Sequence, residues 1–316
     1  MSDSKDAIAH AVSVLESGGL VAFPTETVYG LGADASNPVA VARLYQVKGR
    51  PSDHPVIVHL ADASRVSAWA LQVSPAAQKL MDHFWPGPLT VIVKRRSGVP
   101  DLLTGGQDTI GLRVPSHPLA RALLRAFGRG VAAPSANRFG RISPTSAQHV
   151  RDDLGDAVDL VLDGGDCEVG IESAIVDCSG DRPALLRPGI ISAGEFAALL
   201  GKEMAPASRA SPRAPGTLEA HYAPVKPLRM TTDVDAALRG EGRRCAVMSF
   251  SAAPANAGTS LWLQAPADPG GYAHRLYANL RRLDASDCEA IVVESVPDGA
   301  EWAGVRDRLA RAARPD

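Results

Sequence analysis

Short apolar runs alternate with helical patterns through the first two hundred residues, and this alternation limits the chain to a few architectures. The predicted strands cover 20–23, 56–60, 89–93, 110–114, 131–134, 160–162, 174–176 and 184–186. Apolar residues recur at helical spacing before the first strand, over 7–15, and between some of the strands, over 39–47, 74–84 and 117–127. The alternation predicts an α/β fold. The irregular spacing of so many short strands argues against a simple doubly wound sheet.

The chain has 316 residues, which is long for one domain and sufficient for two. A segment rich in proline, alanine, serine and arginine covers 205–227 and has the composition of a linker. A second α/β pattern follows, with predicted strands at 245–250 and 290–296 and predicted helices at 272–284 and 300–313. We therefore expect a catalytic domain at 1–204, a linker at 205–227 and a smaller domain at 228–316.

Charge and cysteine content exclude several classes of protein. The formal net charge is −2, so no overall positive field attracts nucleic acid or a membrane surface. Arg281 and Arg282 are the nearest approach to a basic run, and we expect them on a solvated helix face. The four cysteines lack the close spacing of zinc or redox motifs, which favours reduced structural thiols. No apolar run is long enough to span a bilayer, and no secretory signal pattern is present, so a cytoplasmic protein is expected.

Polar residues recur on one side of the predicted strands, where alternation places residues i and i+2 together. The expected one-sided groups are Thr25, Thr27 and Tyr29; His59; Thr109, Gly111 and Arg113; Ser135 and Asn137; and Ser173. Any one group is compatible with simple solvent exposure. Repetition over five segments predicts a sheet with a polar, concave face that lines a ligand cavity.

The residue types around this face favour phosphate as the ligand. Lys48, Arg50, Arg113 and Arg187 lie in or beside these segments, together with the hydroxyls of Thr109, Ser135 and Ser143 and the amide of Asn137. Basic side chains and hydroxyl donors are the usual partners of phosphate oxygens. The sequence contains neither a Walker-type loop nor a dinucleotide-binding glycine fingerprint after its first strand. A nicotinamide-dependent enzyme is therefore disfavoured.

Seven ordered motifs closely resemble the YrdC/Sua5 family. They are PTETVYGLGADA (24–35), KGRPSDHPVIVHL (48–60), WPGPLT (85–90), LRVPSHP (112–118), PSANRFGRISPT (134–145), GIESAIVD (170–177) and LLRPG (185–189). The segment APGTLEAHYAP (214–224) resembles the piece that joins the YrdC-like domain to a Sua5-type C-terminal domain. The resemblance implies a twisted mixed sheet with a concave cavity, then the linker, then a smaller Rossmann-like α/β domain.

The family makes threonylcarbamoyl-AMP and pyrophosphate from L-threonine, bicarbonate and ATP, and this activity is what the resemblance implies here. A separate tRNA threonylcarbamoyl-transferase complex then modifies adenosine 37 of tRNA. The implied ATP-binding positions are Lys48, Arg50, His54, Thr109, Ser135, Asn137, Ser143, Arg187 and Tyr222. The implied L-threonine positions are Thr27, His59, Arg113, Ala133 and Ser173.

Several points stay open at the level of sequence. His54 stands where many family members have asparagine, which puts that nucleotide contact in doubt. We assign no general base, although His59 is a candidate, and no protein metal site, although Mg²⁺ is expected to accompany ATP. We expect the linker to act as a lid over the site, the alternative being a passive tether.

Two other functions compete with synthesis of the adenylate. One is a module that binds double-stranded RNA or tRNA without turnover, and the other is a carbamoyl-transfer enzyme of hydrogenase maturation. The near-zero net charge weighs against the first. The second would require zinc-finger and acylphosphatase-like segments, and the sequence contains none.

Overall fold

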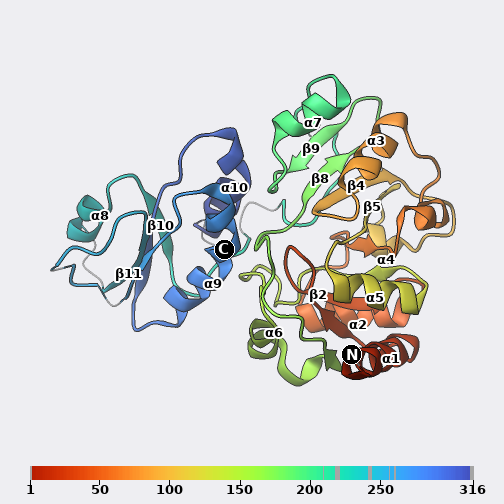
Figure 1. The fold of residues 1–316 in the computed structure, drawn as a ribbon, viewed down its shortest axis with the longest axis horizontal. Coiled ribbons are helices and arrows are strands. Elements are labelled where there is room, and N and C mark those ends of the chain that lie inside the picture. Colours follow the sequence, from red (N-terminus) through yellow and green to blue (C-terminus); the bar gives the residue numbers. More distant parts are fainter. Residues whose placement is uncertain are drawn as a thin grey trace.

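A large mixed sheet and a small parallel sheet form the two units of the protein, side by side with the linker between them (Figure 1). This computed structural model describes residues 2–208, 210–217, 221–240, 244–255, 257–259 and 261–313. Part of the predicted linker motif, at 218–220, lies outside the described residues.

The large sheet has the strand order β7-β1-β2-β6-β3-β5-β4-β8-β9. Its strands are β1 (Val21–Phe23), β2 (Gly30–Asp34), β3 (Ile57–His59), β4 (Leu89–Lys94), β5 (Thr109–Arg113), β6 (Val131–Ala132), β7 (Leu160–Val161), β8 (Ala174–Asp177) and β9 (Ala184–Arg187). The pairs β1–β7, β3–β5 and β4–β8 are parallel, and the other five pairs are antiparallel. The predicted mixed sheet is confirmed.

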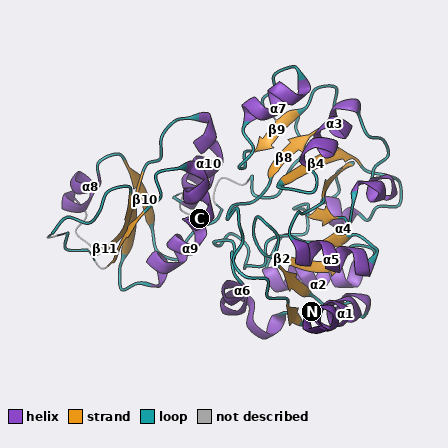
Figure 2. Ribbon diagram, in the orientation of Figure 1, coloured by secondary structure: helices purple, strands orange, loops and turns teal. Residues whose placement is uncertain are grey.

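Helices cover this sheet on its outer faces (Figure 2). They are α1 (Ser2–Glu16), α2 (Pro38–Lys48), η1 (Ala63–Ala68), α3 (Pro75–Phe84), α4 (Asp101–Thr104), α5 (Pro118–Phe127), α6 (Ala147–Leu154), η2 (Gly155–Ala157) and α7 (Ala193–Leu200). Val21 and Phe23 of β1 pack with apolar residues of α1 and α5, whereas Leu20 and Ala22 belong to the core on the other face. The strand alternation therefore buries both faces of β1.

The ends of helix α2 are fixed by local chemistry, and this positions the basic residues that follow. The side chain of Asn37 caps the first turn by accepting from the amides of Val39 and Ala40. Gly49 ends the helix with φ +64°, a left-handed conformation that glycine adopts without steric cost. Lys48 thus stands at the last helical position, and Arg50 begins the next segment.

The smaller unit contains four parallel strands in the order β10-β13-β11-β12. Its elements are β10 (Leu228–Thr231), α8 (Val234–Gly240), β11 (Cys245–Ser249), β12 (Leu261–Gln264), α9 (Pro269–Ala285), β13 (Ala290–Glu294), η3 (Ala300–Trp302) and α10 (Ala303–Ala312). Helix α8 covers the outer face, and α9 and α10 cover the face turned toward the large unit (Figure 1). The predicted Rossmann-like arrangement is confirmed.

Two predictions made from strand periodicity and charge are wrong. Residues 24–29 form turns rather than an extended strand, and the strand follows them as β2. Tyr29 consequently points away from Thr25 and Thr27 into the core, where its hydroxyl donates to the carbonyl of Gly165 at 2.8 Å. Arg281 is a contact between the units rather than a solvated residue, because it donates to the Asp153 carboxylate at 2.6 and 2.9 Å.

No helix within the described part of the chain combines the length and the apolar character needed to cross a membrane.

Candidate active site

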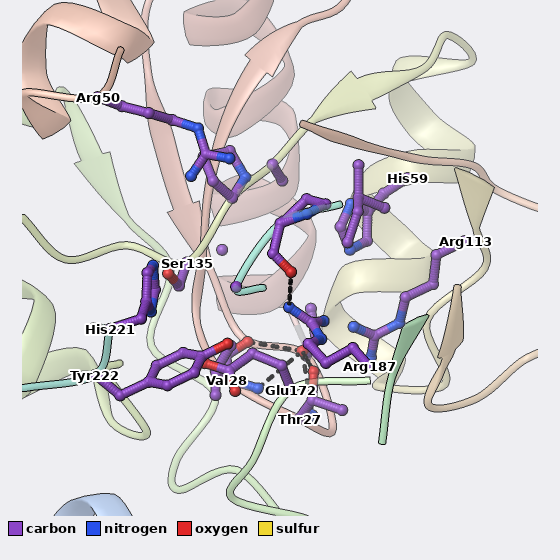
Figure 3. A pocket seen from close by; sticks show the side chains of 17 residues that line it. Thr27, Val28, Arg50, His59, Arg113, Ser135, Glu172, Arg187, His221 and Tyr222 are labelled. Atoms are coloured by element: carbon purple, nitrogen blue, oxygen red, sulfur yellow. Dashed lines mark hydrogen bonds between the residues drawn. The ribbon is translucent and has the colours of Figure 1, made fainter. Parts of the chain in front are cut away.

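A small enclosed cavity lies where the large sheet, the 133–135 loop and the linker meet (Figure 3). Its lining residues are Thr25, Thr27, Val28, Gly30, Arg50, Ile57, His59, Arg113, Ala133, Pro134, Ser135, Glu172, Arg187, Pro215, Gly216, His221 and Tyr222. The space in which water centres fit is about 50 Å³, which is room for only a few water molecules. The linker therefore covers the site in this structure.

At one end of the cavity Arg113 forms a buried ion pair with Glu26, with an Nη2–Oε1 distance of 2.7 Å. The other oxygen of Glu26 accepts from the amide of Ser116, and the Nε of Arg113 donates to the carbonyl of Gly87. The guanidinium is thus held in one orientation and keeps part of its donor set free toward the cavity. Close to this end, the hydroxyls of Thr25 and Thr27 are 2.8 Å apart.

His59 lies beside Arg113 and is almost completely buried. Burial, with the neighbouring Arg113 charge adding to it, lowers the pKa of His59 to about 3. Its Nδ1 has no hydrogen-bond partner among the described atoms. Because a group with so low a pKa is a weak proton acceptor, this imidazole suits a hydrogen bond to a ligand better than the role of general base.

At the other end of the cavity two basic residues are buried among neutral acceptors. Lys48 donates to the carbonyls of Ser135 and Asn137 at 2.5 Å each. Arg50 donates to the carbonyl of Pro55 at 2.7 Å. Burial lowers the pKa of both side chains. The charge of Arg50 lowers the pKa of Lys48 further, and the charge of Arg187 lowers the pKa of Arg50 further. Neither cation has a carboxylate partner among the described residues.

Arg187, at the end of β9, is a third buried cation that is bonded to neutral groups. It donates to the carbonyl and the hydroxyl of Ser173 at 3.1 and 3.3 Å, and to the carbonyl of Pro215 at 2.8 Å. Burial lowers its pKa. Since Pro215 belongs to the linker, Arg187 attaches the linker to the wall of the cavity.

Glu172 is a buried carboxylate in the same wall. Its oxygens accept from the hydroxyl of Ser143, the hydroxyl of Tyr277 and the guanidinium of Arg308. Burial alone would raise the pKa of Glu172, but the charges of Arg308 and Arg187 outweigh burial and hold it at about 2. The group is therefore an anion under ordinary conditions.

The linker supplies the remaining wall through Gly216, His221 and Tyr222 (Figure 3). Tyr222 has φ +63°, which is uncommon for a residue with a side chain. Its ring lies 4.1 Å from that of His221, centroid to centroid, and its hydroxyl has no partner among the described atoms. Packing holds this strained residue in place.

The floor of the cavity is partly apolar, which the polar pattern did not predict. Ile57 lines the cavity and forms a buried cluster with Ile92 and Ile175, against which Ala214 of the linker packs. The linker is thus held by apolar contacts as well as by hydrogen bonds.

The structure brings eight of the fourteen predicted site residues to the cavity surface. These eight are Thr27, Arg50, His59, Arg113, Ala133, Ser135, Arg187 and Tyr222. The other six, which lie behind the surface, are Lys48, His54, Thr109, Asn137, Ser143 and Ser173. Most of these six touch a lining residue: for example, the carbonyl of His54 accepts from Arg50, and Ser143 donates to Glu172.

The polar pattern placed Thr25 on the cavity face without a specific role, and sequence reasoning did not single out Glu172, Gly216 and His221, which also line the cavity. Each of these residues lies inside one of the sequence segments that resemble the YrdC/Sua5 family, and that position was the available signal for a role in the site. Glu172 is the most consequential of them, because a carboxylate is not expected in a pocket for phosphate.

Within the described residues no three histidine, cysteine or carboxylate side chains gather to hold a metal ion. The two acids of the cavity region, Glu26 and Glu172, are both occupied by cations. The protein groups therefore do not fit a resident Mg²⁺ site.

Two family models match the chain. One, described as telomere recombination and covering the Sua5, YciO and YrdC proteins, matches residues 13–189. The other, described as the threonylcarbamoyl-AMP synthase C-terminal domain, matches residues 191–314.

Full-length relatives agree with these matches. The chain is 39% identical to the threonylcarbamoyl-AMP synthase of Bacillus subtilis, over 99% of this chain and 94% of the relative. It is 35% identical to that of Pyrococcus abyssi, over 96% and 93%. The crystal structure of P. abyssi Sua5 complexed with L-threonine superposes with a TM-score of 0.89 at 33% identity, covering 97% of this chain and 94% of that chain.

Proposed function

The chain belongs to the Sua5/YciO/YrdC family, and from this membership and the cavity we propose that it makes threonylcarbamoyl-AMP and pyrophosphate from L-threonine, bicarbonate and ATP. By reaction type it is a nucleotidyltransferase. A separate tRNA threonylcarbamoyl-transferase complex consumes the product in forming N6-threonylcarbamoyladenosine at position 37 of tRNA.

The observation that carries this proposal is the set of three buried cations with neutral partners. Lys48, Arg50 and Arg187 are bonded to carbonyls and a hydroxyl rather than to carboxylates. Burying a charge without a counter-ion is costly. A polyphosphate ligand supplies the missing negative charge, so the nucleotide binds against Arg50 and Arg187 at the cavity surface, with the charge of Lys48 behind it.

L-threonine occupies the other end of the cavity, where the neighbouring lining groups are Thr27, His59, Arg113 and Ala133. The guanidinium of Arg113, already oriented by Glu26, binds the amino-acid carboxylate. The neutral imidazole of His59 and the hydroxyl of Thr27 complete the polar contacts. Ser173 lies behind the cavity surface, so it orients Arg187 by accepting a hydrogen bond and does not touch the substrate.

The chemistry requires positioning and charge stabilisation. The threonine amine adds to the carbon of bicarbonate, and loss of water leaves a carbamate. A carbamate oxygen then attacks the α-phosphorus of ATP, forming the new P–O bond while the bond to pyrophosphate breaks. Arg50 and Arg187 neutralise charge that develops on the phosphates. Because Glu26 and Glu172 are occupied, Mg²⁺ enters as part of the ATP substrate, and no step is assigned to a protein-bound metal.

The linker serves as a lid over the reactive product. An acyl-phosphate-type adenylate hydrolyses readily, so a closed site protects it. Support comes from the small free volume and from Tyr222, whose unpartnered hydroxyl faces Gly216 over the cavity. Because Pro215, Gly216, His221 and Tyr222 of the linker wall the cavity, the linker opens to admit ATP.

Pyrophosphate release tests the reaction directly. We expect release to require threonine and bicarbonate together with ATP. The substitutions Lys48→Ala and Arg50→Ala should each lower turnover at least about tenfold, since losing a charge-stabilising contact typically costs a few kcal/mol. Arg96→Ala, at an exposed arginine, is the control. Release that ignores threonine or bicarbonate contradicts the reaction, and salt-dependent tRNA binding without any turnover would favour the RNA-binding alternative.

A further inference from the structure

Glu172 poses an electrostatic problem for a site that binds a triphosphate. Its carboxylate lines the cavity, is 7% exposed and faces the same space as Arg187 (Figure 3). An uncompensated carboxylate there would repel phosphate and would attract Arg187 away from it. Some group must neutralise Glu172 without using the cations of the site.

That group comes from the smaller unit. Arg308, on helix α10, donates through Nε to the Glu172 carboxylate at 2.8 Å and through Nη2 to the Glu172 carbonyl at 3.2 Å. Its Nη1 donates to the carbonyl of Pro188 at 3.0 Å and to the carboxylate of Asp307 at 2.7 Å, and Arg311 also donates to Asp307. Arg308 has no exposed surface and is among the largest fully buried side chains of the protein. One guanidinium therefore joins α10 to the segments that precede β8 and follow β9.

The same guanidinium also contacts the linker. It lies over the ring of Tyr222, 5.2 Å from the ring centroid, and Tyr277 of α9 packs against the same ring at 5.7 Å. Tyr277 in turn donates to Glu172 at 2.9 Å. The carboxylate and the linker tyrosine are thus held by the same pair of residues from the smaller unit.

Close backbone packing keeps Arg308 at this place. A Cβ atom added to Gly304, one turn before Arg308 on α10, would lie 2.5 Å from the carbonyl oxygen of Gly189. Helix α10 can approach the large unit this closely only because residue 304 is glycine. A mobile surface arginine could not hold Glu172 with comparable precision.

We propose that Arg308 is a positioning residue for the synthase reaction: it neutralises and orients Glu172, so that Arg187 stays available to ATP, and it supports Tyr222 in the closed linker. This role rests on the proposed function. The smaller unit thereby contributes a side chain on which the nucleotide end of the site depends, while the threonine end depends on Glu26 and Arg113 of the large unit.

The test uses the full-length chain and three variants, Arg308→Met, Arg308→Met combined with Glu172→Gln, and Arg306→Met. Arg306 lies on the same helix, and its partners among the described residues are the carbonyls of Pro297 and Gly299, so it is the matched control. The measurements are kcat and the KM for ATP from pyrophosphate release, the Kd of L-threonine by calorimetry, and Tm.

We expect Arg308→Met to lower kcat/KM for ATP at least about tenfold while the threonine Kd changes less than about twofold. Arg306→Met should stay within about twofold of the unsubstituted chain in both quantities. Adding Glu172→Gln to Arg308→Met should recover at least about threefold of the lost kcat/KM, because it removes the charge that Arg308 neutralises. Recovery at a temperature well below the Tm of both variants, where both are fully folded, distinguishes this role from one that only stabilises the fold.

Contrary outcomes are distinct. If Arg308→Met matches the unsubstituted chain, or if the double variant is folded by Tm yet no more active than Arg308→Met, the positioning role is wrong. If Arg308→Met does not fold, the double variant is tested in its place, because Glu172→Gln removes the buried carboxylate that Arg308→Met leaves unpaired. A double variant that folds but is inactive overturns the positioning role. An unsubstituted chain without threonine- and bicarbonate-dependent turnover instead overturns the proposed function, and this role with it.

Discussion

Gly216 offers the sharpest test of the linker as a lid. It has φ +73°, and a Cβ atom there would lie 2.0 Å from the hydroxyl oxygen of Tyr222 and 2.8 Å from Nη1 of Arg187. Tyr222 is 1% exposed and packed by neighbouring rings, so its hydroxyl cannot move aside easily. Gly216→Ala should therefore oppose closure of the linker.

The magnitude follows from a control with the same backbone strain. Gly201, after helix α7, has φ +69°, but a Cβ atom there meets nothing within 4 Å. Both substitutions carry the left-handed cost of about 1–2 kcal/mol, and only Gly216→Ala adds overpacking of about 1–3 kcal/mol. Because 1.4 kcal/mol is a factor of ten, the closed linker should lose about fivefold to a hundredfold in population.

The assays are kcat/KM for pyrophosphate release, the lifetime of the adenylate, and the rate of proteolysis in the linker. Relative to Gly201→Ala, Gly216→Ala should lower both kcat/KM and the lifetime of the adenylate at least about fivefold. It should also speed cleavage of the linker by the protease. Equal activity and equal adenylate lifetime in the two variants would refute the reasoning and leave the linker as a passive tether.

The two buried carboxylates of the cavity region give further predictions. Glu26→Ala should destabilise the chain by about 3–5 kcal/mol, because it leaves Arg113 buried without its partner. Asp287 forms an exposed pair with Arg244, so Asp287→Ala should lower the free energy of unfolding by less than about 1 kcal/mol. Urea unfolding measures both losses, and equal values for Glu26→Ala and Asp287→Ala would contradict this. The pKa of Glu172 is about 2 in the folded chain against an ordinary 4.5, so its stabilising contribution of about 3 kcal/mol is present above pH 4.5 and is lost as the pH falls toward 2. Glu172→Gln should flatten that part of the pH–stability curve, and an unchanged acid slope would show that Glu172 is not responsible.

Helices with a clear apolar period could be predicted from the sequence, whereas a strand whose place depends on pairing with distant strands could not. The helical pattern at 117–127 corresponds to α5 at Pro118–Phe127, because its apolar face is clear and Gly128 ends it with φ +70°. Strand β2 at Gly30–Asp34 was missed, because its residues GLGAD carry little β-propensity and all five are buried. Its place in the sheet depends on pairing with β1 and β6, which is information that a local window does not contain.

The residue types of the site could be predicted from the sequence, but the ion pairs between them could not. Charge and hydroxyl content indicated phosphate, and the structure places Arg50 and Arg187 at the cavity as expected. The sequence could not show that Arg113 and Glu26, 87 positions apart, would pair. The contact between Glu172 and Arg308 spans 136 positions and two units, so it too was invisible to any local pattern.

The role of Arg187 connects nucleotide binding to the linker. Three of its five N–H groups are used, on Ser173 and on the linker carbonyl of Pro215, so two remain for phosphate oxygens. ATP can therefore bind Arg187 without displacing the linker. Arg187 is attracted by the charge of Glu172 but forms no ion pair with a carboxylate among the described residues, so phosphate adds a directly bonded counter-charge and holds the guanidinium in the orientation that donates to Pro215. Nucleotide binding and linker closure should consequently favour each other, and linkage requires the coupling to be equal in both directions.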